Sequence, residues 1–316
     1  MSIRVEAVTV CVGYADFLAE TLRENLPHLD HIVVVTSPSD EETHKVCRRN
    51  SVQYVMSDDY RRNGTWEGDQ ATSTVFNKGR MIRRAFDQIG GQDWVLHLDA
   101  DIVLPRGFRR LLDVANLDSR CIYGADRQDV VGWEAWQRLK SYAGPWSNHS
   151  HENAHWFHPG LKMTSRWVSS IHGFAPIGFF QLFHGSELIK DGYHVRNYPT
   201  YHGDAARSDV QFALQWDRQN RHIIPELVVL HLNSEDAPLG TNWSGRKTKQ
   251  FSAQPSAAAH HRPSCPPYYG CHEYVVFDAK SRRVVYGPES KVACETFVRA
   301  NPGLRDIVVR EIRDSP

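Results

Sequence analysis

The sequence predicts an α/β fold: a mostly parallel sheet flanked by helices, followed by a small β-β-α-β appendage. The first supporting observation is that β-branched segments alternate with segments of helical periodicity through the first half of the chain. The second is an ordinary globular balance, with 41% hydrophobic and 23% charged residues in a chain of 316. Alternating strands and helices form right-handed βαβ units, and such sheets bind ligands beyond the carboxyl ends of their strands.

The individual elements follow from residue patterns, taken in chain order. Apolar and β-branched runs predict strands at 6–13, 31–35, 52–56, 94–99 and 226–232, and residues 121–125 are also strand-like. Apolar side chains at helical spacing predict helices at 14–25, 39–50 and 76–86. The acidic residues at the start of the second helix complement the positive end of its dipole.

Three parts are predicted along the chain. A core domain covers 1–251, and its middle is crowded with aromatic residues. A Ser-, Ala- and Pro-rich stretch predicts a linker over 252–267. Residues 268–316 have the pattern strand, turn, strand, helix, strand, which predicts the appendage.

Composition bounds the class of protein. Lys and Arg number 37 and so do Asp and Glu, which excludes a protein that coats nucleic acid by bulk charge. We expect no membrane span and no leader, because no apolar run approaches the ~20 residues of a membrane helix. Six cysteines at irregular spacing predict reduced thiols and a cytoplasmic location. Cys265 and Cys271 lie too far apart for the usual structural zinc motif.

Two acidic residues follow the predicted strand at 94–99. Asp99 and Asp101 are two positions apart, so their carboxylates point to one side of an extended backbone. Hard oxygen donors at the carboxyl end of a strand suit Mn²⁺ or Mg²⁺, which can bridge the oxygens of a diphosphate. The alternative interpretation is an acidic turn after a core strand.

This acidic motif and four others, in order along the chain, resemble those of a glycosyltransferase of the GT-A type, family 2-like, as found in phage and bacteria. The resemblance covers about 8–251 and rests on HIVVVTSPSD, Asp99–Ala100–Asp101, RSDVQFALQW, ELVVLHLNSED and NWSGRKTKQF. It implies a metal-dependent, inverting transfer of a sugar from a nucleotide-diphosphate sugar, with UDP-sugars favoured. The acceptor would be a hydroxyl group on a glycan, a small molecule or modified DNA.

The resemblance also implies roles for individual residues. Asp99, Asp101 and His231 would bind the metal ion, and Asp209 would be the general base, with Asp204 as the reserve candidate. Residues implied to contact the donor are Thr36, Asp40, Lys78, Arg80, Asp99, Arg246, Lys247 and Lys249. Residues expected to shape the acceptor and sugar site are Asp126, Phe179, Phe180 and Gln181.

Each assignment has a structural alternative. Ser208 and Gln211 fit a capping box, which would make Asp209 a first-turn acid that complements the helix dipole. His231 could be a surface histidine, and the basic residues near 246–249 a solvated loop. We expect His97 to face away from Asp99 and Asp101, or to be a core neighbour.

Two other functions compete with glycosyl transfer. A nucleotidyltransferase would need a Gly-rich loop with a basic residue after the first strand, which VGYADF lacks. A relict protein would bind a sugar nucleotide or nucleic acid without turnover. A hydroxymethylated pyrimidine in DNA is one conceivable acceptor, since paired arginines such as Arg83–Arg84 and Arg109–Arg110 could follow phosphates, although such pairs are usually solvated helix faces.

Overall fold

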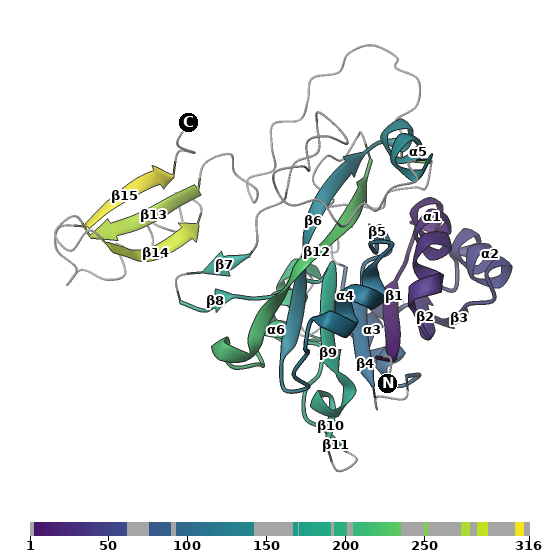
Figure 1. Cartoon of the computed structure of the whole chain (residues 1–316), viewed down its shortest axis with the longest axis horizontal. Coiled ribbons are helices and arrows are strands. Elements are labelled where there is room, and N and C mark those ends of the chain that lie inside the picture. The colour runs from purple at the N-terminus through teal and green to yellow at the C-terminus, as the bar shows by residue number, and fades with distance from the viewer. Residues whose placement is uncertain are drawn as a thin grey trace. The chain divides into compact units, whose positions relative to one another are not determined.

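The computed structural model describes residues 3–61, 76–89, 93–141, 167–169, 171–190, 193–200, 205–234, 250–251, 273–278, 283–289 and 307–312 (Figure 1). The chain divides into two compact units. The first comprises Met1–Arg166 and Ala175–Gln254, and the second comprises Trp167–Phe174 and Pro255–Pro316.

The first unit is built on a sheet of eight strands among the described residues, in the order β3-β2-β1-β4-β9-β6-β12-β5. These strands are β1 (Val5–Val10), β2 (His31–Thr36), β3 (Gln53–Met56), β4 (Trp94–Leu98), β5 (Ile102–Val103), β6 (Ile122–Val131), β9 (Phe180–His184) and β12 (Arg221–Asn233). The neighbours from β3 to β4 pair in parallel, as do β6 and β12, whereas β9 and β5 pair antiparallel with theirs. Figure 1 shows β6 and β12 side by side as the two longest strands.

Helices and short elements connect these strands. The helices are α1 (Ala15–Asn25), α2 (Glu41–Arg49), α3 (Lys78–Phe86), α4 (Phe108–Val114), α5 (Trp133–Ser141) and α6 (Ala205–Ala213). The 3₁₀ turns are η1 (Leu26–His28), η2 (Asp59–Arg61), η4 (Gly185–Glu187) and η5 (Arg218–Asn220), and β10 (Ile189–Lys190) pairs with β11 (Tyr193–His194). None of the described helices combines the length and the apolar character that a membrane crossing requires.

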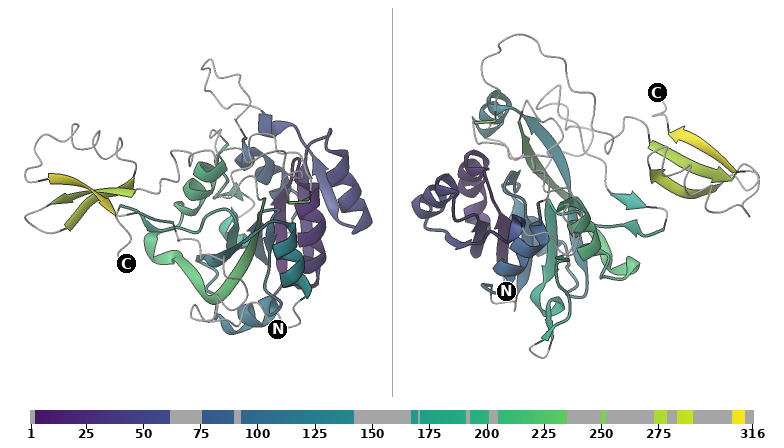
Figure 2. Two further views of the ribbon diagram at one scale, coloured as in Figure 1. Left: turned by 90° about the horizontal axis from the view of Figure 1, so that it is seen from above. Right: turned by 180° about the vertical axis from the view of Figure 1, so that it is seen from behind.

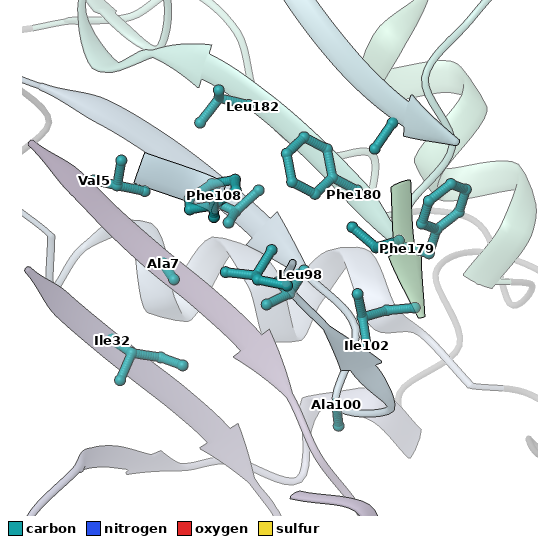
Figure 3. Close-up of a cluster of buried hydrophobic side chains, with 14 of the residues drawn as sticks. Val5, Ala7, Ile32, Leu98, Ala100, Ile102, Phe108, Phe179, Phe180 and Leu182 are labelled. Carbon is teal, nitrogen blue, oxygen red and sulfur yellow. The ribbon is translucent and has the colours of Figure 1, made fainter. Parts of the chain in front are cut away.

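Apolar side chains cover both faces of the sheet. On one face, Leu18 of α1, Val46 of α2 and Phe108 of α4 belong to one buried cluster, in which Phe180 and Leu182 lie near Phe108 (Figure 3). On the other face, the rings of Phe86, Phe183 and Phe212 join α3, β9 and α6. Burying a side chain of this size contributes about 1.5–3 kcal/mol. Leu182 and Phe183 are neighbours in β9 and point to opposite faces of the sheet, because successive side chains of a strand alternate. Figure 2 shows the helices on the two sides of the sheet.

The second unit contains two small sheets among its described residues. β7 (Val168–Ser169) pairs with β8 (Gly173–Phe174), and β14 (Arg283–Glu289), β13 (Glu273–Asp278) and β15 (Ile307–Ile312) form an antiparallel sheet in that order. These last three are the strands predicted for the appendage. The predicted linker over 252–267 and the predicted helix before β15 lie outside the described residues.

The predicted fold class is confirmed: an α/β domain with a mostly parallel sheet flanked by helices. Two strands of the eight-stranded sheet, β5 and β9, were not predicted. Phe180–His184 enters the middle of the sheet as β9, between β4 and β6, with its first four residues buried. The aromatic run that we expected to shape a ligand site is therefore largely part of the core.

Candidate active site

The site lies where β4, β6 and β12 end, the edge at which an α/β sheet presents ligands. Asp99 follows β4 directly, and the chain then turns through Asp101 into β5. Side chains of α1 hold this turn: Thr21 Oγ1 donates to Ala100 O at 2.8 Å, and Asn25 Nδ2 donates to Ile102 O at 2.8 Å. Buried hydrogen bonds from a helix therefore fix the backbone that carries both carboxylates.

Strand register brings Asp101, Asp129 and His231 together, and we call these three residues the rim triad. β12 pairs with β5 through His231 and Ile102, and with β6 through His231 and Asp129. His231 Nδ1 lies 2.8 Å from Asp129 Oδ1, and His231 Nε2 lies 3.5 Å from Asp101 Oδ2. Burial alone would lower the pKa of His231, but the two carboxylates raise it to about 9.

A second cluster, which we call the buried clamp, consists of Lys78, Asp99 and Asp209. Lys78 Nζ lies 2.6 Å from Asp99 Oδ1 and 3.1 Å from Asp209 Oδ2, and it lies 3.5 Å from Gly178 O. Burial opposes the charge on Lys78, yet the carboxylates of Asp209 and Asp99 hold its pKa above the ordinary value. The pKa of Asp99 is raised, chiefly by burial. The charge of Asp101 raises this pKa further, and the charge of Lys78 acts in the opposite direction.

Two glycines allow the clamp to close. A Cβ atom at Gly178 would lie 1.9 Å from Asp209 Oδ2, and one at Gly79 would lie 2.0 Å from Pro199 O. Both distances are far inside van der Waals contact, so each position requires glycine unless neighbouring atoms move. Gly178 therefore lets β9 and α6 approach closely enough for Lys78 to bridge two carboxylates.

The start of α6 differs from one of our two interpretations of Asp209. The helix begins at Ala205, so Ser208 lies inside the helix and cannot form the predicted capping box with Gln211. The Asp209 side chain is only 7% exposed and faces Lys78 rather than the helix terminus. Asp209 is thus a buried, ion-paired carboxylate, and its role as a base stays a prediction.

A chain of buried polar groups lies beside the clamp. Gln181 Nε2 donates to Pro176 O at 2.8 Å and to Asp209 O at 3.0 Å, so its Oε1 faces Tyr198. The Tyr198 hydroxyl donates to that oxygen and accepts from His97 Nδ1 at 2.6 Å. This order of donors places the proton of neutral His97 on Nδ1.

His97 does not face away from the acidic pair. Its Nε2 lies 3.7 Å from Asp99 Oδ1, because residues 97 and 99 share one face of the extended chain. Burial and the nearby Lys78 lower the pKa of His97 well below its ordinary value, so the ring is neutral. Within the described part of the chain, Nε2 has no hydrogen-bond partner.

The residues expected to shape the sugar and acceptor site are mostly buried. Phe180 and Gln181 are fully buried, and the Phe180 ring packs edge-on against Phe108. Phe179 lies under the Arg127 guanidinium, whose carbon is 4.7 Å from the ring centroid. Asp126 is buried on β6, in register with Val228 of β12. Direct ligand contact by these residues stays a prediction.

Two residues implied in donor binding, Thr36 and Asp40, lie at the end of β2 and at the start of α2, respectively. Asp40 caps α2 by accepting from the Thr43 backbone N–H at 3.2 Å and from the Thr43 hydroxyl at 2.7 Å. It also accepts from the Gly13 N–H at 2.7 Å, at a turn whose φ of 72° favours glycine. Thr36 is buried, with its hydroxyl 3.4 Å from Asp40. Asp40 thus joins two turns, and its contact with a donor stays a prediction.

The basic residues implied in donor binding fall into two groups. Arg80 lies in the first turn of α3, where its Nε donates to Thr200 O at 3.1 Å. Arg246, Lys247 and Lys249 lie outside the described residues, as does Asp204. Of the basic candidates, only Lys78 is placed among the described site carboxylates, and it contacts these rather than projecting into solvent.

A divalent cation at the rim would have two protein ligands, Asp101 and His231. No group of three or more His, Cys, Asp or Glu residues in the described ranges is arranged to hold a metal ion. Asp101 and His231 nevertheless face each other, and Asp101 Oδ1 is buried without a hydrogen-bond partner in those ranges. Two protein ligands suffice for a cation that is also held by substrate phosphates and water. Asp99 is paired with Lys78, so its role as a metal ligand stays a prediction.

Two site residues were missed by sequence reasoning. Asp129 belongs to β6, which runs to Val131 and so extends well beyond the predicted strand-like segment 121–125. The available signal for a site residue was a polar residue near the end of a strand. Tyr198 lies in a loop between β11 and α6 that carries no motif. Its place beside His97 depends on a contact across 101 residues of chain, which no local pattern reveals.

No protein-family model matches this chain, and no curated protein sequence matches it. Among solved structures, glucosyl-3-phosphoglycerate synthase from Mycobacterium tuberculosis with UDP is similar at 12% identity and a TM-score of 0.28, over 39% of this chain and 44% of that chain. The same synthase with Mn²⁺, UDP-glucose and phosphoglyceric acid is similar at 11% identity and a TM-score of 0.41, over 73% of this chain and 72% of that chain. Mannosyl-3-phosphoglycerate synthase from Rubrobacter xylanophilus is similar at 19% identity and a TM-score of 0.32, over 59% of this chain and 55% of that chain. The chain thus spans less than half of the first of these structures, and its function has to be inferred from the site itself.

Proposed function

We propose that this protein is a metal-dependent glycosyltransferase that moves a sugar from a nucleotide-diphosphate sugar, with UDP-sugars favoured, to a hydroxyl acceptor. The observation that carries the proposal is the meeting of Asp101 and His231 at the carboxyl edge of the sheet, 3.5 Å apart. An acidic pair after a core strand and a histidine from a neighbouring strand suit a cation that carries a diphosphate. The sequence resemblance agrees with this arrangement.

Two members of the rim triad, Asp101 and His231, supply the protein ligands for Mn²⁺ or Mg²⁺ in this proposal. Asp101 contributes an oxygen and His231 a nitrogen, a mixed set that favours Mn²⁺ over Mg²⁺. When bound, the metal ion would neutralise charge that develops on the leaving diphosphate. Asp99 either binds the metal ion as well or stays paired with Lys78. Substitution of Asp99 and of Lys78 in separate variants distinguishes a metal ligand from an ion-pair partner.

The buried clamp supplies the acid–base chemistry in this proposal. The acceptor hydroxyl oxygen forms a bond to the anomeric carbon, the bond from that carbon to the diphosphate oxygen breaks, and the hydroxyl proton passes to a carboxylate of the protein. Asp209 is the proposed base, which implies inversion at the anomeric carbon. Its Oδ2 atom lies 3.1 Å from Lys78 Nζ, so the base and this cation are direct neighbours.

DNA is the less favoured acceptor. In the described residues, Arg84 pairs with Asp59 at 2.8 Å and Arg109 pairs with Asp30 at 2.8 Å. Arginines that are already matched by carboxylates contribute less to a phosphate-binding track. We therefore expect transfer to a small-molecule or glycan hydroxyl, and salt-sensitive binding of duplex DNA would contradict this expectation.

The test is a donor-by-acceptor screen with Mn²⁺, in which mass spectrometry identifies the products. Asp101→Ala should lower transfer by roughly 10²-fold, and Asp113→Ala, at an exposed acid in α4, should leave it unchanged. Tight binding of UDP-sugar without turnover would favour the relict binding protein. Release of pyrophosphate from a nucleoside triphosphate would favour the nucleotidyltransferase.

A further inference from the structure

Behind His231, on the side away from Asp101, lies a carboxylate that the proposed reaction does not use. Asp129 Oδ1 lies 2.8 Å from His231 Nδ1, while Asp101 Oδ2 lies 3.5 Å from Nε2. We propose that Asp129 is a positioning residue, which fixes the tautomer and ring orientation of His231 so that its Nε2 binds a divalent cation together with Asp101. This inference rests on the proposed function and adds a residue to its metal site.

The hydrogen bond to Asp129 decides which ring nitrogen is available. An ionised carboxylate only accepts, so the Nδ1 atom of His231 must carry a proton to bond with Asp129. The neutral ring then has its lone pair on Nε2, which faces Asp101. A carboxylate behind a ligating histidine also raises the basicity of the ligand.

Asp129 is itself held in place by the sheet. It is directly opposite His231 in the parallel register of β6 and β12. Asn233, two residues further along β12 and almost completely buried, donates from Nδ2 to Asp129 Oδ1 at 3.1 Å. The carboxylate is therefore fixed by a backbone ladder and by a second buried side chain, which a positioning role requires.

The competing interpretation is that the rim triad is only an ion-paired structural cluster. In that case Asp129 would stabilise the fold, and its loss would lower the melting temperature without any specific effect on metal binding. Metal affinity and stability are separate measurements, so the two interpretations predict different results.

The experiment is a titration of the full-length protein with Mn²⁺, followed by electron paramagnetic resonance, with and without UDP. We expect Asp129→Ala to weaken Mn²⁺ binding about 10- to 100-fold. Asp129→Asn keeps the shape and an acceptor oxygen but loses the charge, and we expect a loss of about tenfold. Asp118→Asn is the matched control, because Asp118 precedes the opposite end of β6 and pairs with Arg120 at 2.7 Å.

Each outcome decides the inference. Either Asp129 variant, folded by circular dichroism, that binds Mn²⁺ with wild-type affinity overturns it. An equal loss in Asp118→Asn also overturns it, because the effect would then be one of general charge. Wild-type protein that binds no Mn²⁺ even with UDP removes the proposed metal site and this inference together, a result distinct from a variant that binds normally.

Discussion

The buried clamp and the rim triad are built from similar groups, yet they are suited to different tasks. Each has two carboxylates and one basic side chain, and the central groups are equally buried: Lys78 and Asp209 are 3% and 7% exposed, and His231 and Asp101 are 7% and 9% exposed. Burial therefore does not distinguish them. What differs is the cation.

In the clamp the cation is part of the chain. The carboxylates of Asp209 and Asp99 hold the pKa of Lys78 above its ordinary value, so its charge persists through the physiological range. In the rim the positive charge is that of the His231 imidazolium, whose pKa the carboxylates raise to about 9, and in the proposed function a divalent ion takes the place of its proton. One cluster is thus a fixed link between β4, α3 and α6, and the other is the proposed metal site.

The largest effect that separates the two clusters should come from Lys78→Met. Removal of the ammonium leaves buried Asp209 and half-buried Asp99 without their shared cation, and breaking a buried pair in this way costs about 3–5 kcal/mol. Urea denaturation measures the change in the free energy of unfolding. Lys45→Met is the control, because Lys45 is 47% exposed and pairs with Glu42 on the surface, where about 0–1 kcal/mol is expected. Equal losses in the two variants would remove the structural role of the clamp.

The next effect should come from the rim, through Asp101→Ala. Loss of one of two protein ligands should lower Mn²⁺-dependent turnover by roughly 10²-fold, because metal-ion stabilisation of a transition state amounts to several kcal/mol. The free energy of unfolding should fall less than in Lys78→Met, since His231 keeps its bond to Asp129. Turnover and urea denaturation are measured on the same preparation. A larger loss of stability than in Lys78→Met would contradict this difference between the rim and the clamp.

A third change tests the close approach that forms the clamp. In Gly178→Ala the new methyl group would lie 1.9 Å from Asp209 Oδ2, and overpacking of this kind costs about 1–3 kcal/mol. Thermal or urea unfolding measures the loss. In the background of Asp209→Ala the methyl group has room, so the second substitution should cost much less than the first does alone. Simple additivity would show that the carboxylate is not what Gly178 accommodates.

The sequence predicts the sheet better than it predicts the site. The strands at 31–35 and 94–99 are local apolar patterns, and the structure has β2 and β4 there. Asp101 and His231 were placed at strand ends by the same local logic, and their meeting follows from the register of β12 with β5. The partners of Lys78 could not be predicted, because one of them is 131 residues away and depends on a glycine in β9's preceding turn.

The smallest predicted effect concerns the polar chain beside the clamp. Tyr198→Phe removes one hydroxyl while the ring keeps its stacked contact with Phe212, with centroids 4.1 Å apart. Loss of the hydroxyl should cost about 1 kcal/mol, since it leaves Gln181 Oε1 and His97 Nδ1 without this partner. Its specific consequence is a change of tautomer. Nδ1 then keeps only the longer contact with Gln181 Oε1 at 3.3 Å, and the proton of His97 should move to Nε2, where it can point towards the charged Asp99 Oδ1 at 3.7 Å.

Nitrogen-15 NMR of the imidazole distinguishes the two tautomers directly. Tyr123→Phe is the matched control. The Tyr123 hydroxyl also makes a hydrogen bond, accepting from Asp118 N at 2.7 Å, but Tyr123 lies at the start of β6 and has no part in the polar chain beside the clamp. If both variants lose a similar amount of stability and only Tyr198→Phe changes the tautomer, the polar chain controls the tautomer of His97. If His97 keeps its proton on Nδ1 in both variants, the 3.3 Å contact of Nδ1 with Gln181 Oε1 holds this tautomer without Tyr198.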